Sequence, residues 1–290
     1  MKVAGFSIAR NVIKFDYPIR EAILSVLPLV DKFYVAVGKS DDDTLNYIKS
    51  ISPDKLVIIE TEWDDNLREG GLVLSIETNK AFDAIPEEFD WAFYIQGDEV
   101  LHEKYYGEII EKMQLCLDAR EVQGLLFGYE HFYGSYDYVG DSRKWYRNEI
   151  RIIRNDKSIR SYKDAQGFRT SENKKLTVKK IDAKIFHYGW VKPPKAQQEK
   201  QKNFHKMWHD DAWVERKTGS EEEFDYSTID SLKKFNETHP EVMWERVKNK
   251  NWIFEYDASK IRLTYKDMLL RWIEKFSNWR PGEYKNYKII

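Results

Sequence analysis

The sequence predicts an α/β fold in which a largely parallel sheet is flanked by helices. In the first third of the chain, short apolar segments alternate with longer segments whose apolar residues recur every three or four positions. This alternation is typical of strand–helix–strand units with right-handed crossovers. A second observation is that polar residues follow each of the first four apolar segments. Because parallel strands end at one edge of a sheet, these polar residues are expected to converge there.

The individual elements follow from this pattern in chain order. Strands are predicted over residues 2–8, 32–37, 55–59 and 91–95. Helices are predicted between them, over residues 18–29, 44–51 and 67–85. Asp16 is expected to cap the first helix, with Pro18 in its first turn, and Pro86 is expected to end the third helix.

The segment around the fourth strand holds the main candidate site. The strand at 91–95 is followed by Gly97 and then by two carboxylates, Asp98 and Glu99. Ligands of open α/β sheets collect beyond the carboxyl ends of strands. A pair of acids there can hold a hard divalent cation, which in turn can hold a diphosphate. The alternative is a turn acid followed by a helix-capping acid, because a helix is expected to begin near Glu103.

Composition and charge exclude several classes of function. The chain has 290 residues, a formal net charge of −2 and 33% charged residues, which argues against a general nucleic-acid binder. No apolar run is long enough to span a bilayer, and the first residues become polar too early for a signal peptide. Cys116 is the one cysteine, which excludes internal disulfides and fits a reducing compartment. We therefore expect a soluble cytoplasmic protein.

The polar loops after the strands form a pattern of their own. Ile8-Ala9-Arg10-Asn11 follows the first strand, an acidic Ser/Asp loop at 40–44 follows the second, and Gln96-Gly97-Asp98-Glu99 follows the fourth. Together they resemble the nucleotide-sugar-binding half of a glycosyltransferase with the GT-A fold, close to the family 2 type. The last segment is similar to the Asp-x-Asp metal motif of that family. It departs from the motif at Gln96, which stands in place of the first acid.

The resemblance implies a Rossmann-like GT-A catalytic domain, with a mixed sheet flanked by helices, over residues 1–192. It also implies a nucleoside-diphosphate sugar as donor and a divalent cation, Mn²⁺ or Mg²⁺, as cofactor. The positions that it implies for donor binding are Ile8, Arg10, Asn11, Asp41, Asp43, Arg68 and Asn79.

The middle third of the sequence extends the resemblance. A strand is predicted over 123–129, followed by an aromatic loop or, as the alternative, a tyrosine-rich hairpin over 131–138. The segment 145–154 resembles the arginine-rich strand of bacterial lipopolysaccharide-type family 2 enzymes. In that group an acidic loop follows and carries the catalytic base, which implies Asp164, although the His-Glu pair of that loop is absent here. Glu149 is the second candidate, with an ion pair to a neighbouring arginine as its alternative.

The segment 181–190 supplies the last part of the pattern. An apolar strand there delivers His187 and then an aromatic residue. In the GT-A fold such a histidine can complete the metal site, so the resemblance implies a site of Asp98, Glu99 and His187. The alternative is a core or turn histidine. The prediction requires Asp98 and His187, which are far apart in the sequence, to meet at the edge of the sheet.

Residues 193–290 are expected to form a mostly helical extension. A polar helix is predicted over 195–208, and the acids at 210–211 are interpreted as capping or surface acids rather than as a metal cluster. Apolar residues at helical spacing predict an amphipathic helix: Tyr265, Met268, Leu269, Trp272, Ile273 and Phe276. We expect it to pack on the catalytic domain or on a second subunit of a homodimer. The alternative is peripheral contact with the inner face of the membrane, because Lys266, Arg271 and Lys275 flank the apolar residues.

These observations predict a metal-dependent, inverting glycosyltransferase that moves a sugar from a nucleoside-diphosphate sugar to an acceptor hydroxyl. The resemblance implies a glycan or lipid-linked acceptor and a role in bacterial cell-surface polysaccharide synthesis. A sugar-nucleotide nucleotidylyltransferase is one alternative, but it should carry a glycine-rich loop where this chain has Ala9-Arg10-Asn11-Val12. A non-catalytic carbohydrate-binding protein on a decayed glycosyltransferase fold is the other, motivated by Gln96 and the aromatic content of 15%.

Overall fold

The computed structural model describes residues 1–219, 221–257, 262–277 and 279–290. Most of its strands belong to one mixed sheet, and β9 and β10 pair separately. The strands are β1 Val3–Ala9, β2 Lys32–Gly38, β3 Leu56–Thr61, β4 Trp91–Tyr94, β5 Glu99–Leu101, β6 Gly124–Tyr133, β7 Ser135–Gly140, β8 Asn148–Arg154, β9 Ile159–Tyr162, β10 Gly167–Thr170, β11 Leu176–Trp190, β12 Leu232–Lys234 and β13 Tyr287–Ile289. The α-helices are α1 Ile19–Val26, α2 Thr44–Lys49, α3 Leu72–Asp83, α4 Tyr106–Leu115, α5 Pro194–Lys206, α6 Asp211–Thr218, α7 Trp244–Lys248 and α8 Tyr265–Ser277.

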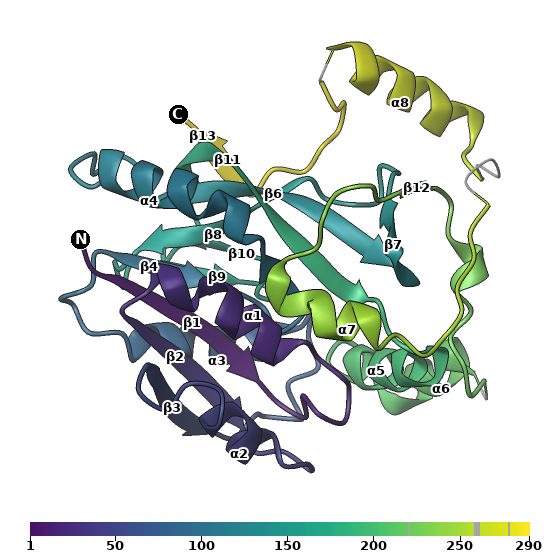
Figure 1. Ribbon diagram of the computed structural model, residues 1–290, viewed down its shortest axis with the longest axis horizontal. Helices are drawn as coiled ribbons and strands as arrows, with labels where there is room; N and C mark the ends of the chain where they lie inside the picture. The colour runs from purple at the N-terminus through teal and green to yellow at the C-terminus, as the bar shows by residue number, and fades with distance from the viewer. Residues whose placement is uncertain (220, 258–261, 278) are drawn as a thin grey trace.

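The first four strands form the parallel half of the sheet, in the order β4-β1-β2-β3. Successive residues of a strand point to opposite faces, and the core divides accordingly. Val3, Val35 and Phe93 pack with α1 on one face. Ala4, Ala36 and Tyr94 pack with α3 on the other. The predicted parallel arrangement is confirmed, and the ends of β1 and β4 lie together at one edge (Figure 1).

The second half makes the sheet mixed, as the predicted fold class requires. β8 runs antiparallel to both β4 and β6, and β11 runs parallel to β6. β11 also pairs antiparallel with β5, in a register that places His187 opposite Glu99. This long strand therefore returns the chain to the loop that follows β4.

Residues 131–138 form the hairpin that the sequence left as an alternative to a loop. β6 continues to Tyr133, the chain turns at Gly134 with φ 71°, and β7 begins at Ser135. Glycine adopts this left-handed conformation without steric cost. Phe132 and Tyr136 are buried on either side of the turn, so the aromatic residues serve the core here.

Two predicted details of the helices are wrong. α3 begins at Leu72 rather than at residue 67, because Gly70 and Gly71 precede it with φ of 56° and 72°, outside the helical region. Asp16 does not cap α1. It has φ 48°, and its carboxylate accepts a hydrogen bond from Arg246 at 2.8 Å.

In its described residues, the C-terminal part of the chain holds the helices α5 to α8 and the short strands β12 and β13, separated by long irregular segments. Asp210 caps α6 by accepting a hydrogen bond from the backbone N–H of Trp213 at 2.8 Å, and Asp211 pairs with Arg68, which confirms the interpretation of these acids. α5 and α6 lie against each other at the end of β11 (Figure 1). The division of the chain at residue 192 stays a prediction.

α8 stands away from the body of the molecule (Figure 1). Its apolar side chains are exposed, with Tyr265 at 89%, Trp272 at 60% and Phe276 at 71%. The expected packing of this face on the catalytic domain is therefore wrong for the described chain. Its polar side holds it instead, through ion pairs of Arg271 with Asp141 and of Glu274 with arginines of the body. A partner subunit and a membrane surface stay predictions, and none of the described helices has the length and apolarity needed to cross a bilayer.

Candidate active site

A cavity of about 420 Å³ opens at the sheet edge where β1 and β4 end. Several parts of the chain that are distant in sequence form its walls. They include the segment 8–12 at the end of β1, the segment 96–98 after β4, the β9–β10 loop at 164–166, the end of β11 and one side of α5. Of the polar strand ends that the sequence predicted to converge, those of β1 and β4 thus line a cavity, and the loop at 40–44 after β2 does not.

The structure places some of the predicted site residues on this cavity and others away from it. Those that line it are Ile8, Arg10, Asn11, Asp98, Asp164 and His187. The predicted residues outside its lining are Asp41, Asp43, Arg68, Asn79, Glu99 and Glu149. The role of each stays a prediction.

Asp98 and His187 meet at the cavity wall. Nε2 of His187 lies 3.7 Å from Oδ1 of Asp98, and Nζ of Lys200 donates a hydrogen bond to Oδ2 at 3.0 Å. Burial raises the pKa of Asp98, but the charge of Lys200 and its hydrogen bond outweigh burial and hold the pKa below its ordinary value. A Cβ at Gly189 would lie 2.6 Å from Nε2 of His187 and 2.7 Å from Oδ2 of Asp98. Only glycine leaves room at this position for the two side chains to approach.

The hydrogen bonds of His131 fix the orientation of His187. Nε2 of His131 lies 2.8 Å from the Tyr146 carbonyl oxygen, so it must donate. Burial lowers the pKa of His131 to about 3, which keeps its ring neutral and leaves Nδ1 as an acceptor. Nδ1 of His187, 3.2 Å away, then donates to it. Burial also lowers the pKa of His187, and its Nε2 therefore presents a lone pair towards Asp98.

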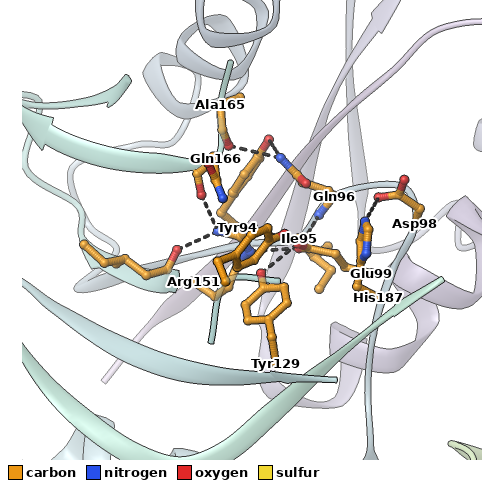
Figure 2. Close-up of polar contacts among 12 residues, drawn as sticks. Tyr94, Ile95, Gln96, Asp98, Glu99, Tyr129, Arg151, Ala165, Gln166 and His187 are labelled. Carbon is orange, nitrogen blue, oxygen red and sulfur yellow. Dashed lines mark hydrogen bonds and ion pairs between the residues drawn. The ribbon is translucent and has the colours of Figure 1, made fainter. Parts of the chain in front are cut away.

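Glu99 is held away from the cavity by a buried ion pair. Its carboxylate accepts hydrogen bonds from Arg151 Nη2 at 2.7 Å and Nε at 2.8 Å, and from the Tyr129 hydroxyl at 2.7 Å (Figure 2). Neither Glu99 nor Arg151 is exposed to solvent. Both carboxylate oxygens are thus already bonded within the core.

The residues at the cavity fit a divalent cation with two protein donors. Among the described residues no three His, Cys, Asp or Glu side chains come together as a metal group. Asp98 Oδ1 and the lone pair of His187 Nε2 do face each other. Magnesium at phosphate-transfer sites takes one or two carboxylates and completes its shell with phosphate oxygens and water. A two-donor site of this kind suits a cation that arrives with a diphosphate.

Gln96 has a structural role at the position where the resemblance leads one to expect an acid. Its Nε2 donates a hydrogen bond to the Ala165 carbonyl at 3.1 Å (Figure 2). A carboxylate could not donate this bond. Gln96 therefore ties the loop after β4 to the β9–β10 loop that carries Asp164.

Asp164 and Glu149, the two candidate bases, differ in their access to the cavity. Asp164 lines it, and burial raises the pKa of its carboxyl group. A Cβ at Gly71 would lie 2.9 Å from Cβ of Asp164, so glycine there makes room for the loop. Burial raises the pKa of Glu149 to about 8, but this side chain lies within the sheet. Of the two, Asp164 is the carboxylate that a ligand in the cavity can reach.

The other residues predicted to bind the sugar donor make contacts that support the loops around the cavity. Arg10 pairs with Asp65, with Nη2 at 2.9 Å from Oδ2, and its guanidinium lies 5.4 Å from the centre of the Trp63 ring. The side-chain oxygen of Asn11 accepts a bond from the backbone N–H of Asp41 at 2.7 Å. Contacts of the same supporting kind are made by Asp43 with Asn46, Arg68 with Asp211 and Asn79 with the backbone N–H of Ser161.

The sequence analysis missed the contribution of α5. Lys200, Gln201, Asn203, Phe204 and Met207 all line the cavity, as do Trp63 and Trp190. A signal was present, because Phe204 and Met207 follow Lys200 and Gln201 at helical spacing. The apolar residues of this polar helix therefore share a side with two polar ones.

No protein-family model matches the chain, and a comparison with curated proteins finds no match. Among solved structures it is similar to S. aureus TarS 1–349 in complex with UDP, with a TM-score of 0.38 and 15% identity over 70% of this chain and 64% of that one. It is also similar to glucosyl-3-phosphoglycerate synthase from Mycobacterium tuberculosis in complex with Mn²⁺, UDP and phosphoglyceric acid, with a TM-score of 0.29 and 19% identity over 46% of this chain and 43% of that one. A third is the 4-diphosphocytidyl-2C-methyl-D-erythritol synthase from Anaerococcus prevotii, with a TM-score of 0.32 and 12% identity over 53% of this chain and 71% of that one. These likenesses are distant ones of fold, and the chain spans about two thirds of the TarS fragment.

Proposed function

We propose that the chain is a glycosyltransferase that moves a sugar from a nucleoside-diphosphate sugar to an acceptor hydroxyl. The observation that carries the proposal is the presence of Asp98, His187 and Asp164 on one cavity at the ends of β1 and β4. This is the edge where ligands of open α/β sheets bind. Aromatic walls and a few convergent polar groups are typical of a small-molecule site.

The reaction requires stabilisation of the departing diphosphate and removal of a proton from the acceptor. A divalent cation, held by Asp98 and His187, would neutralise the charge that develops on the diphosphate. Asp164 is the proposed base, because a carboxylate of raised pKa on the cavity wall can accept the hydroxyl proton during attack. A single displacement inverts the anomeric centre. Glu149 is the second candidate, and its pKa of about 8 keeps it protonated at neutral pH.

The finer parts of the proposal concern the acceptor and the cellular location of the reaction. A glycan or lipid-linked acceptor fits a cavity with open access and tryptophan walls. Bacterial cell-surface polysaccharide synthesis at the inner face of the membrane is the proposed setting, and the exposed apolar side of α8 supports it.

A panel of nucleotide sugars in a thermal-shift assay, with and without Mn²⁺, tests the proposal. A ligand that binds only the folded chain must raise its melting temperature, by an amount that reflects its affinity. The strongest donor should then be turned over with release of the nucleoside diphosphate. Formation of a nucleotide sugar from a nucleoside triphosphate would favour the nucleotidylyltransferase, and binding of sugars without turnover would favour the non-catalytic alternative.

A further inference from the structure

Lys200 places a buried positive charge on the wall of the cavity. It comes from α5, and its Nζ donates hydrogen bonds to Oδ2 of Asp98 at 3.0 Å and to the Gly189 carbonyl at 2.8 Å. The side chain is 10% exposed, and it reaches the cavity beside the proposed leaving-group position. Burying an ammonium group costs free energy, so a buried lysine at this position calls for a functional explanation.

The ammonium group keeps its charge and has one donor to spare. Lysine ordinarily carries its charge at neutral pH, and here the ammonium group lies against the carboxylate of Asp98. An ammonium carries three N–H donors, and the described residues supply two acceptors, on Asp98 and Gly189. The third donor is available to an acceptor in the cavity.

A second lysine lies behind the cavity wall near Lys200. Lys192 is fully buried, and its Nζ lies 4.9 Å from the centre of the Tyr17 ring, while Nζ of Lys200 lies 4.8 Å from the same ring. Nζ of Lys192 donates a hydrogen bond to the backbone carbonyl of Asp16, and this lysine is outside the cavity lining. Lys200 is therefore the lysine of the two that an anionic ligand in the cavity can reach.

We propose that Lys200 binds the diphosphate of the donor as a fixed cation of the protein. The inference rests on the proposed function and names a residue of α5 as part of its donor site. As the sugar C1–O bond breaks, the electron pair stays on the diphosphate oxygen, and the Lys200 ammonium stabilises that charge. The acceptor oxygen bonds to C1, and its proton goes to Asp164. A cation that belongs to the chain should give the diphosphate appreciable affinity even when no metal ion is present.

Binding of the best nucleoside diphosphate, measured by calorimetry in EDTA and in Mn²⁺, tests this role. Wild type should bind in EDTA, and Lys200→Met should bind at least tenfold more weakly, since a hydrogen bond to a charged group is worth that much. Lys202→Met is the matched control. It lies on the same helix, donates to the Glu221 carbonyl at 3.3 Å and is outside the cavity lining, so its affinity should stay unchanged.

A double-mutant comparison separates direct binding from an effect through Asp98. If Lys200 contacts the diphosphate, Asp98→Asn/Lys200→Met should bind at least tenfold more weakly than Asp98→Asn in EDTA. The double variant removes both charges together, whereas Asp98→Asn alone leaves the buried ammonium of Lys200 without its partner and Lys200→Met alone leaves the carboxylate of Asp98 without its partner. Circular dichroism and melting temperature check that each variant is folded.

The outcomes distinguish this inference from the proposed function. Equal affinity of Asp98→Asn and the double variant overturns the inference, because Lys200 then acts only by neutralising Asp98. Wild-type binding that requires Mn²⁺, or a Lys200→Met affinity within about threefold of wild type, overturns it as well. Absence of any nucleoside diphosphate binding by wild type, in either buffer, contradicts the proposed function instead.

Discussion

α5 and α8 come from the same part of the sequence, and each has 13 residues, but they relate to the rest of the chain in opposite ways. α5 is largely polar, yet Gln197, Gln198 and Lys200 are buried. α8 carries the clear apolar stripe, yet no residue of this helix is buried. From the hydrophobic pattern alone, α8 would be expected to be buried against the rest of the chain and α5 to be exposed to solvent.

The difference shows which observations point to function. Buried polar residues and exposed apolar faces both oppose the usual partition between core and solvent. Of the buried polar residues on α5, Lys200 faces the cavity, so the proposed donor site would account for its burial. The exposed apolar residues of α8 have no counterpart in the described chain, and a partner for them stays a prediction.

The largest expected effect is a loss of catalytic rate on substitution of Asp164, which lines the same cavity as α5. Asp164→Asn should lower kcat by about 10²- to 10⁴-fold with little change in nucleoside diphosphate affinity, because it removes the base and leaves the donor site intact. Wild-type kcat should fall as the pH falls through the raised pKa of Asp164, since the base must be unprotonated. Glu149→Gln is the control with a buried carboxyl group outside the cavity. A larger loss in Glu149→Gln than in Asp164→Asn would exchange the two roles.

The next effect concerns the pH dependence of stability near the start of α5. Burial lowers the pKa of Lys192 to about 7 from its ordinary 10.5, so the folded chain releases this proton before the unfolded chain does. The unfolded state then binds more protons between these values, and the free energy of unfolding should rise with pH from about 7 to 10.5. Lys192→Met should remove most of that rise, on the order of 1–3 kcal/mol. Urea unfolding at a series of pH values measures it, and an unchanged slope would mean that Lys192 is not buried as described.

A smaller effect is expected at the cap of α6, which packs against α5. Asp210→Ala removes the acceptor for the Trp213 backbone N–H and should lower the free energy of unfolding by about 1 kcal/mol. Asp210→Ser, which keeps a capping oxygen, should lose little. Equal losses in both variants would show that charge, not capping, gives Asp210 its effect.

Substitutions on α8 are expected to have the smallest effect on binding of the nucleoside diphosphate. Leu269→Glu and Trp272→Glu should leave nucleoside diphosphate affinity within about twofold, because this helix is exposed and outside the cavity. The same variants should reduce sedimentation with vesicles of anionic phospholipid, since an interfacial helix binds through its apolar side. Lys202→Glu, at a half-buried position of α5, is a control for added negative charge. If sedimentation is unchanged while light scattering shows loss of a dimer, the face binds a second subunit rather than a membrane.

Much of the fold could be predicted because its causes are local. Runs such as Trp91–Tyr94 identify strands by composition, and the order of strands and helices limits the connections to parallel ones. The meeting of Asp98 and His187 was also foreseen, though through the resemblance rather than through periodicity. The start of α3 was predicted at residue 67 instead of Leu72 because Gly70 and Gly71 can adopt either helical or left-handed conformations, and the sequence does not choose between them.

The candidate site was harder to predict because the position of each of its side chains depends on residues far away in the sequence. In the sequence Asp98 and Glu99 are equivalent acids, but Glu99 begins β5 and points to Arg151, which lies 52 residues away. Asp98 lies in the turn before β5 and lines the cavity, whereas Glu99 lies in the strand and points into the core. Lys200 gave no sign of burial, because only the packing of α5 at the end of β11 brings it to Asp98.

The sequence by itself determined the alternation of strands and helices and the polar ends of the parallel strands, because both depend on side chains within a few positions of each other. Tertiary structure decided which acid faces the cavity, which lysine stands beside it and which helix stays uncovered. Those outcomes depend on strand register and on contacts between segments far apart in the chain, and no periodicity in a single segment encodes them.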